Sequence, residues 1–441
     1  MQTTLAPEFQ NTLAGQEAEA ILRKCVHCGF CTATCPTYQL LGDELDGPRG
    51  RIYLIKQTLE GEAPTAKTQL HLDRCLTCRN CETTCPSGVQ YGRLVDIGRS
   101  IVEKKVKRTR FEHLLRWALR EGLTSPLFGY AMRLGQWARP VLPSLLKAKI
   151  PLLQESVRTK KIPLISSLQE LIDLDGPSVQ TTRFSRKVLL LAGCVQPAMA
   201  PNINKATANV LEAMGVQALY AEGAGCCGAL SHHLNAQEAA LAQMRRNIDA
   251  WWPLLQEGVE ALVMTASGCG VSVKEYAHLL AHDKEYATKA LDVSNATKDL
   301  SEWIIAQTNE IPKLKEKLMG DKVREQGLQA YHPPCTLQHG QQIKEGVQSL
   351  LTALGFDVAM ATQESHLCCG SAGTYSVLNP SIANTLKERK LGHLLALKPK
   401  GILSANVGCI SHLQSGASLP VRHWIEMIDS SLLKPSGLDC R

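Results

Sequence analysis

The chain has 441 residues, more than one hydrophobic core usually serves, so we expect two to four domains. Its composition, 44% hydrophobic and 20% charged, is that of a globular protein, and a net charge of +7 over this length does not indicate a nucleic-acid partner. No stretch approaches the ~20 apolar residues of a membrane-spanning helix, and the first residues lack the basic region and apolar core of a signal peptide. We therefore expect a cytoplasmic protein whose contact with the inner face of the cytoplasmic membrane, if it has one, is peripheral or made through a partner.

The first 102 residues contain the pattern C-x2-C-x2-C-x3-C-P twice. Residues 13–24, with helical apolar spacing, lead into the first copy. Between the copies, Pro48 suits a first helical turn and the apolar residues after it, up to Leu59, again have helical spacing. The sequence therefore predicts an α-helical ferredoxin-like domain over residues 1–102.

This cysteine pattern is the bacterial run that holds [4Fe–4S] clusters by thiolates, and in two-cluster proteins the fourth cysteine of each run ligates the other cluster. The prediction is two clusters, one on Cys25, Cys28, Cys31 and Cys85 and one on Cys75, Cys78, Cys81 and Cys35. Zinc is a poorer fit, because its sites usually combine two separated cysteine pairs. Disulfides would need an oxidising compartment, which nothing in the sequence indicates.

Four arginines lie close in sequence to these cysteines: Arg49, Arg51, Arg74 and Arg79. A cluster with four thiolates is anionic, so nearby guanidinium groups would stabilise it and tune its potential. The alternative is that each is an ordinary solvated arginine.

Residues 103–185 are predicted to be a basic, partly helical connector. Residues 103–120 read as one basic helix with an apolar stripe that includes Phe111 and Leu114. Such a helix suits an anionic membrane or a partner, or else packs on its own domain with its charges in water. Residues 121–185 are rich in proline and basic residues, with weak periodicity.

From residue 186 the pattern changes to strands alternating with helices, which predicts parallel α/β units. We expect strands at 187–192, near 218–220 and at 261–264, and helices at 202–214 and 236–252. The cysteines of this region occur in two sets of the same order, and each member of the second set follows its counterpart by 140 to 142 residues. We interpret this as a duplication that gives two facing α/β lobes, residues 186–320 and 321–441.

The stretch from Gly223 to Gly228 satisfies G-x-G-x-x-G, but its position does not fit a dinucleotide site. A dinucleotide fingerprint opens the first strand–helix unit and has an acidic residue at the end of the next strand. Here the glycines follow the second strand, and the acid at a suitable distance, Asp249, lies within a predicted helix. We therefore expect no flavin or nicotinamide site on this chain.

The Cys…Cys-Cys-Gly…Cys repeat resembles the cysteine-rich (CCG) domains of heterodisulfide reductase, anaerobic glycerol-3-phosphate dehydrogenase and lactate-utilisation proteins. With stretches such as 26–38, 45–52, 247–252 and 421–424, residues 20 to 425 resemble the iron–sulfur subunits of bacterial glycolate oxidase (glycolate dehydrogenase). The resemblance implies an oxidoreductase complex in which flavin-binding subunits oxidise glycolate to glyoxylate. This chain would pass the electrons towards the quinone pool or another membrane acceptor.

One departure from the heterodisulfide-reductase pattern concerns the last cysteine of each lobe, which is replaced by Ser272 and His412. The remaining eight are candidates for an additional redox or metal site: Cys194, Cys226, Cys227, Cys269, Cys335, Cys368, Cys369 and Cys409. Four thiolates per lobe suit a further iron–sulfur centre, but metal-free thiols or a redox-active pair fit equally. Cys440 belongs to no pattern and is interpreted as a bystander.

Three functions remain open from the sequence. The first is an electron-transfer subunit, with no catalytic residue of its own, because no acid–base pair or hydride acceptor is evident. The second is a disulfide or quinone reductase that acts through the vicinal cysteines. The third is the same electron-transfer role in a complex that oxidises lactate or glycerol-3-phosphate. The sequence cannot separate these substrates, since substrate contacts would lie on another chain. Five histidines are candidates for proton transfer to a quinone or for structural roles: His332, His339, His366, His412 and His423.

Overall fold

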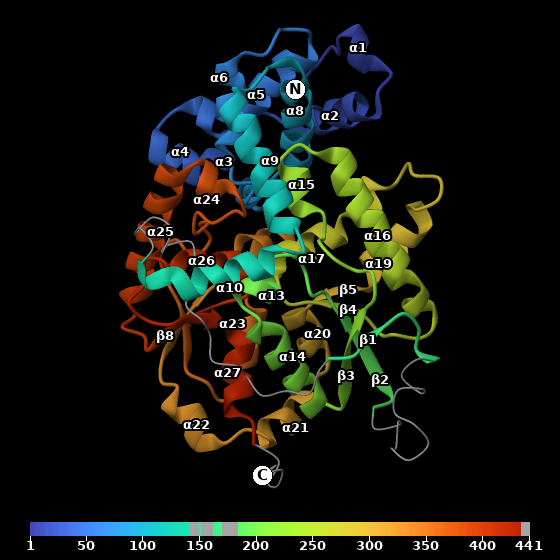
Figure 1. Ribbon diagram of the computed structural model, residues 1–441. Helices are drawn as coiled ribbons and strands as arrows, with labels where there is room; N and C mark the ends of the chain where they lie inside the picture. The colour runs from blue at the N-terminus through green and yellow to red at the C-terminus, as the bar shows by residue number, and fades with distance from the viewer. Residues whose placement is uncertain (142–149, 152–161, 170–183, 434–441) are drawn as a thin grey trace.

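The computed structural model describes residues 1–141, 150–151, 162–169 and 184–433. A helical N-terminal domain lies on one end of two α/β lobes, as Figure 1 shows in blue above the green-to-red remainder. This arrangement confirms the predicted fold class of a helical ferredoxin-like domain followed by two duplicated lobes. Cys440 and parts of the segment 121–185 lie outside the described residues.

The N-terminal domain consists of short helices around the cysteine runs and longer helices that pack on them. Its core is aliphatic and includes Ile21, Leu22, Ile55 and Leu94, all almost fully buried. The helices are α1 (Pro7–Gln10), α2 (Leu13–Lys24), α3 (Phe30–Ala33), α4 (Pro36–Leu41), η1 (Glu44–Asp46), α5 (Pro48–Leu59), α6 (Ala66–Asp73), α7 (Asn80–Thr84) and α8 (Tyr91–Lys105).

The prediction of a single basic helix at 103–120 is wrong, because the structure divides that segment between α8 and α9 (Arg110–Thr124). Thr109 caps α9: its side chain accepts from the backbone N–H of Glu112, and the Glu112 side chain accepts from the backbone N–H of Thr109. This capping box starts α9, and α10 (Phe128–Ala138) and η2 (Arg139–Val141) follow it after a turn at residues 125–127.

The first lobe is built on a five-stranded parallel sheet in the order β1-β3-β2-β4-β5. Its edge strand β1 comes from the segment expected to be a connector and pairs with β3. The strands are β1 (Leu164–Ile165), β2 (Arg186–Leu190), β3 (Val216–Ala221), β4 (Leu262–Met264) and β5 (Thr297–Asp299). The helices are α13 (Gln196–Met199), α14 (Asn202–Ala213), α15 (Ala229–His233), α16 (Gln237–Gln256), α17 (Ser267–Lys274), α18 (Tyr276–Leu279), α19 (Ala287–Ala296), α20 (Leu300–Ala306) and α21 (Glu310–Glu316).

The second lobe repeats this plan on a four-stranded parallel sheet in the order β7-β6-β8-β9. Apart from the added β1, the strand order is the same as in the first lobe, as expected for a duplication. The strands are β6 (Gln329–His332), β7 (Val358–Met360), β8 (Gly401–Ser404) and β9 (Val421–His423). The helices are α22 (Gly320–Glu325), η3 (Thr336–Gly340), α23 (Gly346–Ala353), α24 (Tyr375–Leu378), α25 (Pro380–Leu395), α26 (Val407–Gln414) and α27 (Trp424–Ser431).

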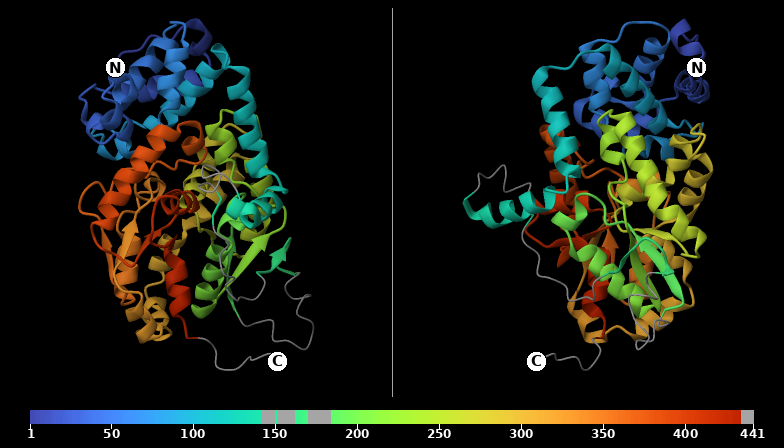
Figure 2. Two further views of the ribbon diagram at one scale, coloured as in Figure 1. Left: turned by 60° about the vertical axis from the view of Figure 1, so that its left-hand side comes forward. Right: turned by 45° about the vertical axis from the view of Figure 1, so that its right-hand side comes forward.

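The two lobes are joined side by side, as both views of Figure 2 show for the green and the orange-to-red segments. One buried apolar cluster contains residues of both sheets, including Val188 and Val263 from the first and Ala330 and Ile402 from the second. At the seam the backbone N–H of Ser267 donates to the carbonyl of Ala405 (3.1 Å). The cysteines of both lobes follow the carboxyl ends of strands, the edge where open α/β sheets bind ligands.

Candidate iron–sulfur and thiol centres

Two cavities in the N-terminal domain are lined by the cysteines of both runs. The first is lined by Cys25, Cys28, Cys31 and Cys85, and also by Cys81. The second is lined by Cys35, Cys75, Cys78 and Cys81. The structure thus brings the fourth cysteine of each run to the cavity of the other run.

Matching backbone conformations shape the two runs around these cavities. In each run the residues two and four positions after the first cysteine have left-handed backbones: His27 (φ 56°) and Gly29 (φ 86°), then Thr77 (φ 52°) and Arg79 (φ 58°). For residues other than glycine this conformation costs about 1–3 kcal/mol, so the surrounding structure must enforce it. The reversals turn successive thiols towards one point, as a cluster requires.

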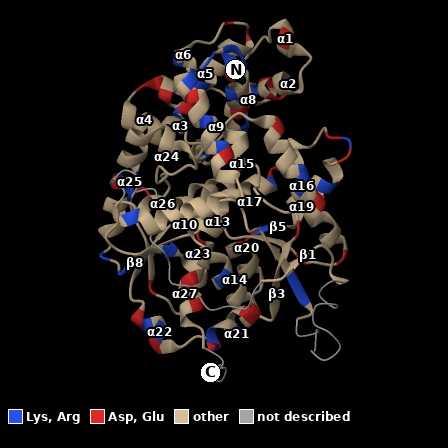
Figure 3. Ribbon diagram, viewed as in Figure 1, with Lys and Arg blue, Asp and Glu red and all other residues tan. Residues whose placement is uncertain are grey.

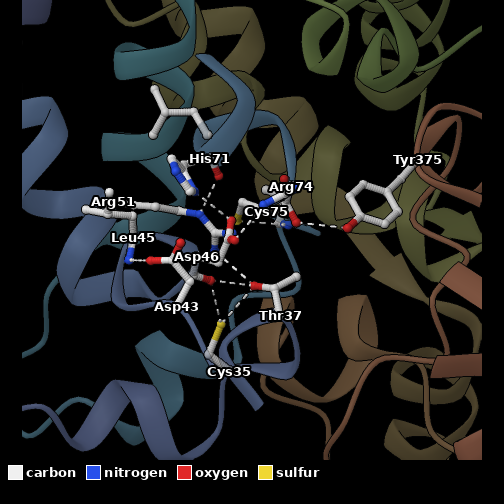
Figure 4. A network of polar contacts seen from close by, with 12 residues as sticks. Cys35, Thr37, Asp43, Leu45, Asp46, Arg51, His71, Arg74, Cys75 and Tyr375 are labelled. Carbon is white, nitrogen blue, oxygen red and sulfur yellow. Dashed lines mark hydrogen bonds and ion pairs between the residues drawn. The ribbon is translucent and has the colours of Figure 1, made fainter. Parts of the chain in front are cut away.

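A buried carboxylate network supports the second cavity (Figure 4). The carboxylate of Asp46 accepts hydrogen bonds from His71 Nδ1 (3.0 Å), Arg74 Nη1 (2.8 Å) and Arg51 Nη2 (3.4 Å). Its carbonyl accepts from Thr37 Oγ1 (2.7 Å) and lies 3.8 Å from Cys35 Sγ. Arg51 and Asp46 are 1% and 0% exposed, so the ion pair between them is shielded from water. Because both charged groups are fixed, the network holds Cys35 in position.

The other predicted arginines have different roles. Arg49 is half-exposed and pairs with Glu44 (2.6 Å), whereas Arg79 pairs with Glu275 of the first lobe (2.8 Å). Sequence reasoning missed Arg99, whose guanidinium donates to the carbonyls of Leu72 (2.8 Å) and Cys75 (2.6 Å) and so fixes the second run. It gave no signal because its partners come together only in the fold.

The donor set of the two cavities fits iron–sulfur clusters. Burial raises the pKa of Cys31 to about 11 and the pKa values of Cys78 and Cys81 well above their ordinary range. Such buried sulfurs become thiolates at neutral pH only beside compensating cationic charge. The iron ions of a cluster supply that charge and take thiolate ligands.

The four cysteines of the first lobe lie together at the ends of β2, β3 and β4. Hydrogen bonds from the thiols of Cys194 and Cys227 lower the pKa of Cys226 well below its usual value. Cys227 also contacts Cys269. The glycine-rich loop that precedes them is held by Asn247, whose side-chain carbonyl accepts from the backbone N–H of Gly225 (2.8 Å).

The second lobe gathers its cysteines in the same way and adds a histidine. The sulfurs of Cys335 and Cys368 are 3.8 Å apart. Side-chain ligand atoms of His332, Cys369 and Cys409 lie within 4.8 Å of one another, and all three residues are buried.

Three of the other histidines considered from the sequence have structural partners for their imidazole groups. His412 Nε2 donates to the carbonyl of Ala383 (3.1 Å), and His423 caps α27 by accepting from the backbone N–H of Ile425 (3.2 Å). His339 Nε2 donates to the carbonyl of His366 (2.9 Å).

The second lobe packs directly on the second cluster cavity. Leu76 and Cys78 belong to one apolar cluster with Cys335, Cys368 and Tyr375. The hydroxyl of Tyr375 donates to the carbonyl of Arg74 (2.9 Å) (Figure 4), and Asn80 Nδ2 donates to the carbonyl of His366 (3.3 Å). The cysteines of the second lobe therefore border the second N-terminal cavity.

This fold and these centres define a class: iron–sulfur proteins with a two-cluster domain and duplicated cysteine-rich domains. A family described as a 4Fe-4S dicluster domain matches residues 21–89, and one described as a cysteine-rich domain matches 188–274 and 329–414. The chain is 51% identical to the glycolate oxidase iron-sulfur subunit of Escherichia coli (strain K12), over 98% of this chain and 100% of that one. It belongs to the family of glycolate oxidase iron–sulfur subunits.

More distant relatives cover the chain to different extents. The probable glycolate oxidase iron-sulfur subunit of Bacillus subtilis (strain 168) is 27% identical, over 93% of this chain and 92% of its own. Lactate utilization protein A of Geobacillus sp. (strain WCH70) is 25% identical, over 55% of this chain and 99% of its own. Among the helices in the described part of the chain, none has the length and apolarity needed to cross a bilayer.

Proposed function

We propose that this chain is the electron-transfer subunit of a glycolate-oxidising complex. The observation that carries the proposal is the pair of adjoining four-cysteine cavities, with cysteines exchanged between the two runs. We assign Cys25, Cys28, Cys31 and Cys85 to one [4Fe–4S] cluster and Cys75, Cys78, Cys81 and Cys35 to the other. When bound, such clusters accept and release single electrons.

The two cavities differ in their access to solvent, and this difference indicates which cluster exchanges electrons with a partner. Cys28 is exposed, and its neighbours Val26 and Phe30 are 70% and 61% exposed. An apolar rim beside a cluster suits a docking partner that exchanges electrons with it. The second cavity is covered by Tyr375 and Cys368 of the second lobe. We therefore place the electron-exchange surface at the first cavity.

Glycolate as the substrate of the complex rests on the full-length similarity to proteins named for glycolate oxidase. The lactate-utilisation relative covers only 55% of this chain, so it does not account for the whole arrangement. Oxidation of a 2-hydroxy acid removes two electrons, and flavins accept two electrons and release them one at a time. We propose that flavin-binding partner subunits oxidise glycolate and that this chain passes the electrons towards quinone.

A basic apolar arm provides the contact with the membrane where quinone is dissolved. The arm consists of α9, α10 and η2, and α10 projects from the side of the molecule in the right-hand view of Figure 2. Its large apolar side chains are exposed: Phe111, Leu114, Trp117, Leu127, Tyr130, Leu134, Trp137 and Val141. The arm, residues 110–141, contains five arginines and two glutamates. Figure 3 shows that few of these charges lie on α10.

Exposed tryptophans beside basic side chains are typical of helices that lie in the interface of an anionic bilayer. We propose that the arm binds such a bilayer peripherally. Sedimentation with vesicles of anionic phospholipid tests this: the chain should co-sediment, and Trp117→Ser/Trp137→Ser should reduce binding at least tenfold. Neutral vesicles provide the control, and undiminished binding by the double variant contradicts the arm as the contact.

The electron-transfer role is tested with the chain purified anaerobically, alone and with its flavoprotein partners. Alone it should contain about eight irons in the two N-terminal clusters and should not oxidise glycolate. In the complex, Cys81→Ser should abolish electron transfer to a quinone analogue while the flavin is still reduced by glycolate. Glycolate oxidation by the isolated chain would contradict the proposal.

A further inference from the structure

Each lobe has four cysteines at matching positions. The two lobes differ at the buried residue three positions before the first of these cysteines. His332 ends β6, three residues before Cys335. The residue three positions before Cys194 in the first lobe is Leu191. Both are buried, at 1% and 5% exposure. The second lobe therefore places an imidazole where the first has an aliphatic side chain.

The imidazole of His332 has no hydrogen-bond partner within the described part of the chain, at either Nδ1 or Nε2. A buried polar group without a partner costs about 1–3 kcal/mol, and a histidine has two such atoms. Its backbone carbonyl accepts from Ser404 Oγ (3.1 Å), so the residue is fixed in place. Among the polar atoms near the ring are the sulfurs of Cys369 and Cys409.

We propose that His332, Cys369 and Cys409 bind one zinc ion in the second lobe, and that the first lobe has no counterpart to this site. The three ligand atoms lie within 4.8 Å of one another. Around one tetrahedral zinc ion, with bonds of about 2.0–2.3 Å, ligand atoms are about 3.5–3.8 Å apart, so closing on the ion requires only small side-chain movements. A mixed set of imidazole and thiolates, without a carboxylate, is typical of zinc.

The surroundings match the charge of such an ion. Two thiolates neutralise Zn²⁺, and Cys368, whose thiol contacts Cys369, is the cysteine available as a fourth ligand. Lys390, 3% exposed, lies close enough to Cys368 and Cys369 for its charge to act on them, while its amino group donates to the carbonyl of Glu364. A third thiolate on the ion would have this ammonium as its counter-charge.

The ion would join three segments that meet only in the fold. His332 comes from the end of β6, Cys369 from the loop after β7, and Cys409 from α26. Tying them together would hold the loop that carries Cys368, which packs against Leu76 and Cys78 of the N-terminal domain. The site would thus be a structural support for the wall of the second cluster cavity.

Metal analysis of the full-length chain, prepared anaerobically with iron and zinc both supplied, tests the proposal. We expect one zinc in addition to about eight irons per chain. His332→Leu, which copies the first lobe, and Cys409→Ser should lose the zinc and keep the irons. The matched control in the first lobe, Cys269→Ser, should keep the zinc. Iron near twelve per chain with no zinc, or full zinc in His332→Leu, would overturn the site.

Two further measurements keep the test decisive if His332→Leu does not fold. Wild-type chain loaded with Co²⁺ in place of zinc should show the visible absorption of tetrahedral thiolate-bound cobalt, and its absence counts against the site. His332→Cys, which supplies another zinc ligand, should retain the zinc. These readouts do not depend on glycolate turnover, so they stand or fall separately from the proposed electron-transfer role.

Discussion

The N-terminal domain contacts the two lobes through different chemistry. Its contact with the first lobe is charged: Glu275 pairs with Arg79 (2.8 Å) and Arg93 (3.2 Å), and Asp96 pairs with His232 (3.3 Å). Its contact with the second lobe uses apolar side chains and neutral hydrogen bonds, among them Leu76 and the hydroxyl of Tyr375.

Because of this difference, the two contacts should respond differently to salt and pH. Charged pairs at a partly wet interface are weakened by salt and depend on pH, whereas an apolar contact has no charge that salt can screen or that pH can titrate. The apolar contact lies where Cys335 and Cys368 of the second lobe approach Cys78, so water and ions are kept from the place where the two sets of cysteines meet. The charged contact lies on the other lobe, although its Arg79 also lines the second cavity.

The largest effect is expected from Leu76→Asp, which places a carboxylate in the apolar contact with the second lobe. Leu76 is 6% exposed, and losing its burial while burying an unpaired charge should cost about 3–5 kcal/mol. Thermal unfolding should show the N-terminal domain separating at a lower temperature, with loss of iron. Leu13→Asp is the matched control, since Leu13 is 56% exposed and should tolerate the change. Equal stability of the two variants would show that the apolar contact contributes little.

The features of the fold and of the site that could be predicted from the sequence are those whose residues lie close together along the chain. The spacing of Cys25 to Cys35 and its repeat are local, and they predicted a cluster-binding fold. The duplication was readable because the cysteine offsets agree within two residues. Strands alternating with helices then predicted parallel α/β units, but the order of the strands in each sheet was not predicted. The grouping of the eight N-terminal cysteines into two ligand sets remains a prediction, which the two cavities support.

Other features depend on residues that meet only after folding. Asp46 and His71 are 25 residues apart, and nothing in the sequence pairs them. His332 was considered for proton transfer, but its nearness to Cys409 could not be anticipated. One missed feature did have a local signal: Thr109 and Glu112 form a capping box, which marks the start of α9 within the segment expected to be one helix.

An intermediate effect is expected from Glu275→Gln in the charged contact. The change leaves Arg79, whose side chain is 18% exposed, without its carboxylate, at a cost of about 1.5–3 kcal/mol. The loss should shrink as salt rises, because wild-type pairing is itself screened. Hydrogen exchange of α8 at low and high salt measures this. Glu121→Gln, at an exposed pair with Arg120, is the control and should change little. A loss that does not depend on salt would contradict a charged contact.

The smallest effect is a pH dependence confined to the first-lobe contact. Burial lowers the pKa of His232, but the hydrogen bond and charge of Asp96 outweigh it, so the pKa is raised above 6.5 overall. Arg79 and Gln237 also face this imidazole. Protonated His232 thus contributes stability that is fully present below pH 6.5 and is lost as pH rises through the raised value.

Asp96, the partner of His232, does not titrate near neutral pH. Burial would raise the pKa of its carboxyl, but the hydrogen bond and charge of His232 lower that pKa to about 2. Hydrogen exchange of α8 and α15 should therefore accelerate as the pH rises above 6.5, beyond the intrinsic increase with pH. In His232→Gln this extra acceleration should disappear, while exchange of α24 in the second-lobe contact follows only the intrinsic rate in both proteins. If α24 accelerated as much as α15, the division between a titrating and a non-titrating contact would be wrong.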